Sequence, residues 1–230
     1  MMARQLALAL AHVESFARED FLVGPSNAAA FALVEQWPDW PSRVMVLVGP
    51  EGSGKSHLAA IWAELAGARF LAARALKTEI VPSALATGAL VVEDIAELVD
   101  ERALFHLLNL AREENGYVLI IARTPPGGGT IEIRDLASRL TALPVVTLAP
   151  PDDALLRAVL VKLFADRQLA VDEFLISYLA SRIERSFAAA RSVVERLDHE
   201  ALRQMRPVTR SLAAEMLREV GLTDGAENAG

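Results

Sequence analysis

The sequence contains no cysteine, and only four of its 230 residues are histidines, scattered at positions 12, 57, 106 and 199. Disulfides and zinc-thiolate sites are therefore excluded, and no metal site other than one for Mg²⁺ is expected. No apolar run reaches the 18 or so residues of a membrane span. The apolar patch at 6–11 is shorter than a usual signal-peptide core and runs into charged sequence. We expect a cytoplasmic protein.

An excess of positive charge is also absent. The chain has 23 Lys and Arg against 30 Asp and Glu, a formal net charge of −7. This balance argues against broad attraction to nucleic acid or anionic membranes, and it favours a protein partner. With 53% hydrophobic residues, the chain can build one large or two modest domains.

The most informative stretch reads GPEGSGKS at positions 49–56 and meets every fixed position of the P-loop pattern G-x-x-x-x-G-K-[ST]. An apolar run before it predicts a buried strand, and the spacing over 57–66 predicts a helix. Such a loop turns backbone N–H groups toward phosphates, Lys55 reaches the β and γ phosphates, and Ser56 holds Mg²⁺. The alternative is a chance glycine turn. The candidate nucleotide-binding residues here are Gly49, Pro50, Glu51, Gly52, Ser53, Gly54, Lys55, Ser56 and His57.

A second apolar run, 89–92, ends in two carboxylates, Glu93 and Asp94, as in a Walker B strand. In a parallel sheet this strand is buried on both faces, and its carboxyl end lies beside the phosphates. We expect Glu93 in the outer shell of Mg²⁺, through water, and Asp94 orienting or activating the attacking water. The alternative is a buried strand that merely ends in carboxylates.

Five strand-like runs alternate with helical spacing up to position 149, which predicts an α/β fold with a parallel five-stranded sheet and flanking helices. After 149–151 the pattern changes to helices only, with N-caps expected at Asp152, Asp172, Ser186 and Thr209. We expect an N-terminal segment at 1–20, an α/β domain at 21–149, a small helical lid at 150–221 and a disordered tail at 222–230. The strands are expected at 44–48, 69–71, 89–93, 117–122 and 145–148, and the last helices at 152–166, 172–183, 187–205 and 209–220.

A P-loop sheet followed by a helical lid resembles the layout of AAA+ ATPases. Within them the chain resembles the DnaA family of bacterial replication initiators over nearly all of 5–220, and it is most similar to the Hda-type regulators of that family. The resemblance rests on four stretches: FLVGPSN at 21–27, DLASRL at 135–140, ERSF at 184–187 and ERLD at 195–198.

The resemblance implies roles for four of these residues. Leu22 and Val23 would help to cradle adenine, and Arg139 would be an arginine finger acting in trans on the nucleotide of a partner. Arg185, in the sensor 2 region, would contact the phosphates of the chain's own nucleotide. Guanidinium groups suit both tasks because they are always charged and carry five donors. The alternatives are a surface salt bridge for Arg139 and a solvated helix-terminal charge for Arg185.

One position departs from the family pattern. Where sensor 1 usually has a small polar or acidic residue, this chain has Arg123. A cation there replaces a water-orienting group, and Glu93 stands in place of an aspartate. Both changes favour a nucleotide-gated regulator with weak or no ATPase activity of its own.

The N-terminal sequence QLALAL, positions 5–10, resembles the peptide by which Hda-type proteins bind the DNA polymerase III sliding clamp (its β subunit). A glutamine amide can bond a polar edge while alternate leucines enter apolar pockets. The alternative is the first turn of an amphipathic helix over 6–16. The candidate clamp-binding residues are Gln5, Leu6, Leu8 and Leu10.

The resemblance thus implies a negative regulator of replication initiation that holds ADP or ATP with Mg²⁺, binds the clamp and stimulates hydrolysis of DnaA-bound ATP. ADP is the expected resident nucleotide. Sequence-specific DNA binding is not expected, because a helix-turn-helix domain like that of DnaA does not follow the lid; a homodimer stays open. The alternatives are a freestanding ATPase resembling a helicase loader, and a binding module that uses the fold without nucleotide.

Overall fold

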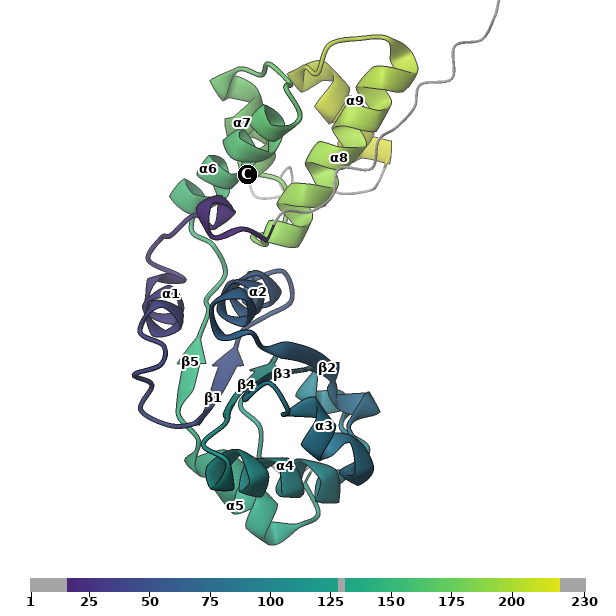
Figure 1. Ribbon diagram of the computed structural model, residues 1–230. Coiled ribbons are helices and arrows are strands. Elements are labelled where there is room, and N and C mark those ends of the chain that lie inside the picture. Colours follow the sequence, from purple (N-terminus) through teal and green to yellow (C-terminus); the bar gives the residue numbers. More distant parts are fainter. Residues whose placement is uncertain (1–15, 128–130, 220–230) are drawn as a thin grey trace, which may run out of the picture. The chain divides into compact units, whose positions relative to one another are not determined.

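A computed structural model describes residues 16–127 and 131–219 (Figure 1). Two compact units make up the described chain: residues 16–151 contain the sheet, and the residues from 152 onward are helical. The candidate clamp-binding residues Gln5, Leu6, Leu8 and Leu10 lie outside the described residues, as does the expected tail at 222–230.

The sheet has five parallel strands in the order β2-β3-β4-β1-β5. The predicted α/β fold class is confirmed. Every residue of β1 and all but the first of β4 are buried, as expected for central strands covered on both faces. The strands are β1 (Val44–Val48), β2 (Arg69–Ala72), β3 (Ala89–Glu93), β4 (Tyr117–Ala122) and β5 (Val145–Thr147).

Alternate residues of each strand face opposite layers of helices. Val44, Val46 and Val48 pack in one cluster with α3 (Val81–Ala84), α4 (Glu101–Glu113) and α5 (Arg134–Ala142). Met45 and Leu47 pack in a second cluster with α1 (Ala28–Glu35) and α2 (Lys55–Ala66). The unit therefore has three layers, and both faces of its sheet are covered (Figure 1). Among the described residues of this unit, four short 3₁₀ helices complete it: η1 (Arg18–Asp20), η2 (Ala73–Ala75), η3 (Thr78–Ile80) and η4 (Ile95–Glu97).

In the C-terminal unit, the described residues 152–219 pack four helices around a core of their own, which includes Leu160, Phe164, Leu179 and Leu197. All four expected N-caps accept a backbone N–H bond from the residue three positions later, at 2.7–3.3 Å. The helices are α6 (Asp153–Asp166), α7 (Glu173–Ala180), α8 (Phe187–Gln204) and α9 (Arg210–Glu219).

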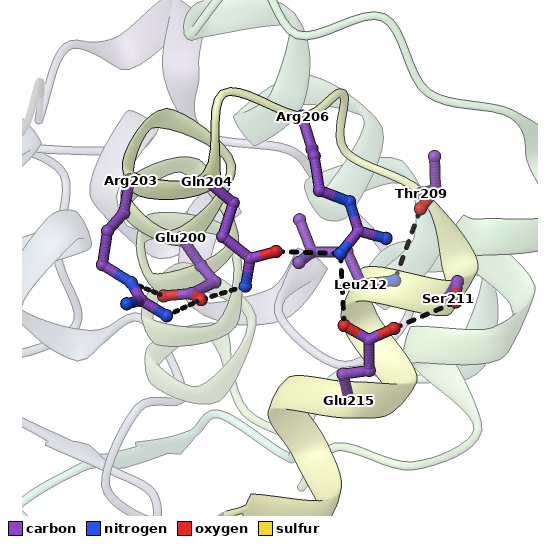
Figure 2. Close-up of polar contacts among 8 residues, drawn as sticks. All are labelled: Glu200, Arg203, Gln204, Arg206, Thr209, Ser211, Leu212 and Glu215. Atoms are coloured by element: carbon purple, nitrogen blue, oxygen red, sulfur yellow. Dashed lines mark hydrogen bonds and ion pairs between the residues drawn. The ribbon is translucent and has the colours of Figure 1, made fainter.

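Polar contacts join the end of α8 to the start of α9 (Figure 2). Arg203 donates from Nε to Glu200 at 2.8 Å, and Gln204 also donates to this carboxylate. These bonds, that of Arg203 first, lower the pKa of Glu200 to about 2. Arg206 bonds the Gln204 side chain at 2.8 Å and Glu215 of α9 at 3.5 Å. The side chains thus brace the turn at Met205, whose backbone is left-handed with φ 50°.

Helices α5 and α7 differ from the sequence expectation. The stretch 135–140, interpreted only as a motif, lies within helix α5. Helix α7 ends at Ala180, three residues before the expected end. Among the residues that the structure describes, no helix has the length and apolarity to span a membrane.

The central strand β4 gives a test of the packing. Leu119 is 1% exposed and lies in the cluster with α1 and α2. We expect Leu119→Ala to lower the free energy of unfolding by about 2–5 kcal/mol, because the truncated side chain leaves a cavity. Urea unfolding followed by circular dichroism measures this loss. Val145→Ala, at a 40% exposed position on edge strand β5, is the control and should cost about 0.5 kcal/mol.

Candidate functional site

The P-loop begins where the paired strands β1 and β4 end. Val48 lies opposite Ala122 in the parallel register, and the Gly49 N–H donates to the Ala122 carbonyl at 3.2 Å. On the other side of β1, the Leu148 N–H donates to the Val48 carbonyl at 2.7 Å. The loop after β1 is therefore fixed at the carboxyl edge of the sheet, where ligands of open parallel sheets bind.

The loop has the backbone shape and close packing that a phosphate cradle needs. Gly52 and Gly54 are left-handed, with φ 69° and 95°, so both positions favour glycine. A Cβ on Gly49 would lie 2.6 Å from the Leu148 carbonyl oxygen and 2.8 Å from Ser53 Oγ. Ser53 is buried, and its Oγ has no hydrogen-bond partner among the described residues. A buried hydroxyl with spare bonding capacity and a glycine-only approach fit a phosphate-bearing ligand.

Lys55 begins helix α2, and its ammonium is folded back onto the loop. Its Nζ donates to the carbonyl oxygens of Gly49 at 2.8 Å and Pro50 at 2.7 Å. Partial burial and then the nearby Arg123 lower the pKa of Lys55, while Asp94 and Glu51 act in the opposite direction. Lys55 thus shares its electrostatic environment with one cation and two carboxylates.

The two carboxylates at the end of β3, Glu93 within the strand and Asp94 directly after it, lie in different environments. Glu93 is half-buried, and burial together with the charge of Asp94 raises its pKa. Asp94 is exposed, with a left-handed backbone at φ 52°. The described residues contain no cluster of three or more His, Cys, Asp or Glu side chains able to hold a metal. This donor set fits Mg²⁺ held by Ser56, water and ligand phosphates, with Glu93 bonded to a water, because Mg²⁺ keeps several waters.

The segment 21–27 is held in place by Asn27. This asparagine is 1% exposed; its Oδ1 accepts from the Gly24 N–H at 2.8 Å, and its Nδ2 donates to the Leu22 carbonyl at 3.0 Å. Leu22 is half-buried and Val23 is 49% exposed. The bonds of Asn27 therefore fix the backbone that carries the two candidate adenine contacts.

His57, the last candidate of the P-loop stretch, faces the segment before residue 21. Its Nε2 lies 3.0 Å from the Ala17 carbonyl oxygen. Its ring packs edge-on against Phe16 and Phe21, with centroids 5.4 and 5.2 Å away. These contacts tie helix α2 to the chain that leads into 21–27.

Arg123 follows β4 directly and reaches the P-loop. Its Nη2 lies 3.0 Å from Glu51 Oε2, and both side chains are largely exposed, 67% and 76%. The predicted cation at the sensor 1 position thus lies next to the loop, paired with one of the loop's own carboxylates.

Arg139 lies on helix α5 and contacts helix α4. Its Nη1 donates to Asn109 Oδ1 at 2.6 Å, its Nη2 lies 3.1 Å from Asp135, and its guanidinium carbon lies 4.5 Å from the centroid of the Phe105 ring. The side chain stays 42% exposed. The salt-bridge alternative is therefore present in the structure, and the guanidinium also remains accessible from solvent.

Arg185 belongs to the C-terminal unit, just before α8. It is exposed, and its Nη2 lies 2.8 Å from Asp153 in helix α6 of the same unit. The contact is an exposed ion pair, of a kind that stabilises a protein by about 0–1 kcal/mol.

Sequence reasoning missed three residues that support the candidate site residues. Asn27 had an available signal, since an asparagine before a helical stretch is a plausible cap, but its side chain turns back to Leu22 and Gly24. Phe105 and Asn109 contact Arg139. The only signal for them in the sequence was their i, i+4 spacing, which places both on one face of a helix.

No protein-family model matches the sequence. The chromosomal replication initiator protein DnaA of Thermomicrobium roseum is 26% identical over 236 aligned positions, covering 87% of this chain and 49% of that protein. The crystal structure of domain III of Thermotoga maritima DnaA covers 89% of this chain and 96% of that one, with a TM-score of 0.73 and 18% identity. DnaA bound to AMPPCP and single-stranded DNA matches with a TM-score of 0.64 and 17% identity, over 81% of this chain and 67% of that one.

The chain is homologous to the AAA+ domain of DnaA. Its fold is that of an AAA+ P-loop NTPase. The chain spans about half the length of the Thermomicrobium relative that it matches.

Gly49 provides a test of the cradle. We expect Gly49→Ala to weaken ADP binding more than about tenfold, because the added methyl group meets backbone on one side and Ser53 on the other. Isothermal titration calorimetry measures the affinity. Gly67→Ala is the control: the Cβ meets nothing within 4 Å, so the cost is a left-handed backbone strain of about 1 kcal/mol with unchanged affinity.

Glu93 gives a prediction on pH. A raised pKa means that the folded state binds this proton more tightly than the unfolded chain does, so Glu93 costs stability above both pKa values. Glu93→Gln should therefore raise the free energy of unfolding near pH 7, by under about 1 kcal/mol for a half-exposed group. The gain should vanish as pH falls through the raised pKa to below the ordinary value of 4.5. Urea unfolding across this range measures it; Glu93→Asp, which keeps a carboxyl group, should retain the wild-type profile.

Proposed function

We propose that the chain binds an adenine nucleotide at the P-loop, with Mg²⁺, and acts as a regulator of DNA replication initiation. The observation that carries this proposal is the P-loop at the carboxyl ends of β1 and β4, in a chain homologous to DnaA. In this loop, Gly49 has no room for a side chain, and the buried Ser53 hydroxyl has no hydrogen-bond partner among the described residues. Backbone N–H groups and Lys55 would hold the phosphates, Ser56 would bind Mg²⁺, and Leu22 and Val23 would contact adenine. A bound Mg²⁺ would supply charge neutralisation between the phosphates.

The regulatory part of the proposal is Hda-like: Arg139 stimulates hydrolysis of ATP held by DnaA. A guanidinium stabilises the charge of a transferring γ-phosphoryl group, which is worth about 10³ to 10⁵ in rate in well-studied hydrolases. Arg139 suits this task because it is accessible and pre-oriented by Phe105 and Asn109. Arg185 would contact the phosphates of the chain's own nucleotide, probing whether the site is filled.

Hydrolysis of the chain's own nucleotide is not the proposed activity. The residue after β4 is Arg123, which cannot accept a hydrogen bond from an attacking water. Asp94 is the remaining candidate to orient water, and it is exposed. The resemblance to Hda-type regulators makes ADP the proposed resident nucleotide, and the protein works by positioning Arg139 rather than by turnover.

The proposed second partner is the DNA polymerase sliding clamp, bound through Gln5, Leu6, Leu8 and Leu10. The support is the N-terminal sequence alone, in which a glutamine amide precedes alternate leucines. Clamp binding would raise the local concentration of the chain at DNA-loaded clamps.

The test is hydrolysis of radiolabelled ATP preloaded on DnaA, after addition of this protein with ADP and DNA-loaded clamp. We expect stimulation that requires both the clamp and Arg139, with Arg139→Ala reducing the rate at least about 10³-fold toward the unstimulated level. Arg218→Ala, which removes an exposed arginine of α9, is the matched control and should retain full stimulation.

Other outcomes separate the alternatives. Stimulation that survives Arg139→Ala would contradict the finger role. Steady ATP turnover by the isolated protein would indicate a freestanding ATPase of the helicase-loader type. Loss of all ADP on purification, with stimulation intact, would indicate a binding module that uses the fold without nucleotide.

A further inference from the structure

The ion pair between Glu51 and Arg123 joins the two loops that the β1–β4 pairing brings together. Arg123 follows β4 at Ala122, and the Ala122 carbonyl accepts from Gly49 at the start of the P-loop. The Glu51 carboxylate, two residues further on, lies 3.0 Å from the Arg123 guanidinium. Glu51 of the phosphate-binding loop therefore forms an ion pair with Arg123, the cation that directly follows strand β4.

Arg123 also interacts electrostatically with Lys55, the proposed phosphate-binding lysine. It lowers the pKa of Lys55, whereas Glu51 and Asp94 raise it, so all three charges lie within electrostatic range of Lys55. The Lys55 ammonium of a P-loop reaches the β and γ phosphates. A phosphate chain that extends to Lys55 thus approaches Arg123, and it brings negative charge to the place that Glu51 neutralises.

We infer that Glu51 is a specificity-determining residue that competes with the terminal phosphate of a nucleoside triphosphate for Arg123. The inference rests on the proposed nucleotide binding. A triphosphate must displace Glu51 from Arg123 and tolerate its charge, whereas a diphosphate is held by the loop backbone and Lys55 without using Arg123. Glu51 therefore weakens triphosphate binding selectively and biases the site toward the diphosphate.

The size of the effect follows from the exposure of the pair. Both side chains are more than half exposed, so their interaction is screened by solvent and is worth a few-fold in an equilibrium constant. We expect Glu51→Gln to tighten binding of AMPPCP, a triphosphate analogue, about two- to fivefold, and to change ADP binding less than about twofold.

The experiment is calorimetric titration of the full chain with ADP and with AMPPCP, each with Mg²⁺. Four chains are compared: wild type, Glu51→Gln, Arg123→Gln and the double variant. The selective gain from Glu51→Gln should disappear when Arg123 is glutamine, because the two residues act as a unit. It should also shrink at about 1 M salt, where charges are screened within about 3 Å. Glu113→Gln, an exposed carboxylate at the end of α4 from which the chain leads into β4, is the matched control and should alter neither affinity.

Three results would overturn the inference. An equal change for ADP and AMPPCP in Glu51→Gln would make Glu51 a general repulsive charge. A selective gain that persists in the Arg123→Gln background would remove the competition. A wild-type chain that binds neither nucleotide would overturn the proposed function and this inference with it. This outcome is distinct from the first two, in which the wild-type chain binds nucleotide.

Discussion

The parallel pairing of β1 with β4 is the constraint on which the candidate site depends. Because both strands run in the same direction and lie in register at Val48 and Ala122, the loops that leave them begin side by side. The next strand, β3, brings Glu93 to the same edge. Three separate stretches of sequence thus supply the P-loop, the carboxylates and Arg123, and apolar packing on both faces of the sheet fixes their spacing.

The same edge holds charges that the protein alone satisfies poorly. Partial burial lowers the pKa of Lys55 and raises that of Glu93, so it disfavours the charged form of both groups. Lys55 compensates by bonding two loop carbonyl oxygens, and Arg123 by pairing with Glu51. A phosphate chain with its cation would offer both signs of charge at once. Perturbed groups of opposite sign at one edge of a sheet are typical of a binding site.

The sequence predicts best what depends on local pattern. Continuous apolar runs predict the strands β1, β3 and β4, because central parallel strands are buried on both faces. The edge strands β2 and β5 are partly exposed and are predicted from shorter runs. The caps at 152, 172, 186 and 209 follow from residue type alone. The i, i+4 spacing of Asp135 and Arg139 was also readable, although it was interpreted as a motif. The contacts of Arg139 with Phe105 and Asn109 were not readable, because they require α4 and α5 to pack on the same face of the sheet. The role of Asn27 was not predictable either, because its side chain bonds the backbone of residues before it, Leu22 and Gly24, and does not cap the helix that follows.

The contacts of Arg139 are compatible with a structural salt bridge and with an arginine finger that engages the nucleotide of a partner. The energies of the contacts separate these two roles. An exposed ion pair such as that with Asp135 contributes about 0–1 kcal/mol, so exchanging it for another anion costs little. Bonds from a guanidinium to phosphate are charge-assisted and often bidentate, and they are roughly twice as strong as neutral bonds. The Phe105 ring packs against the guanidinium, whose carbon lies 4.5 Å from the ring centroid, and this contact restricts the side chain, which lowers the entropy lost when the arginine engages a partner. An arginine held in this way can exchange Asp135 for a phosphate without leaving the surface of α4.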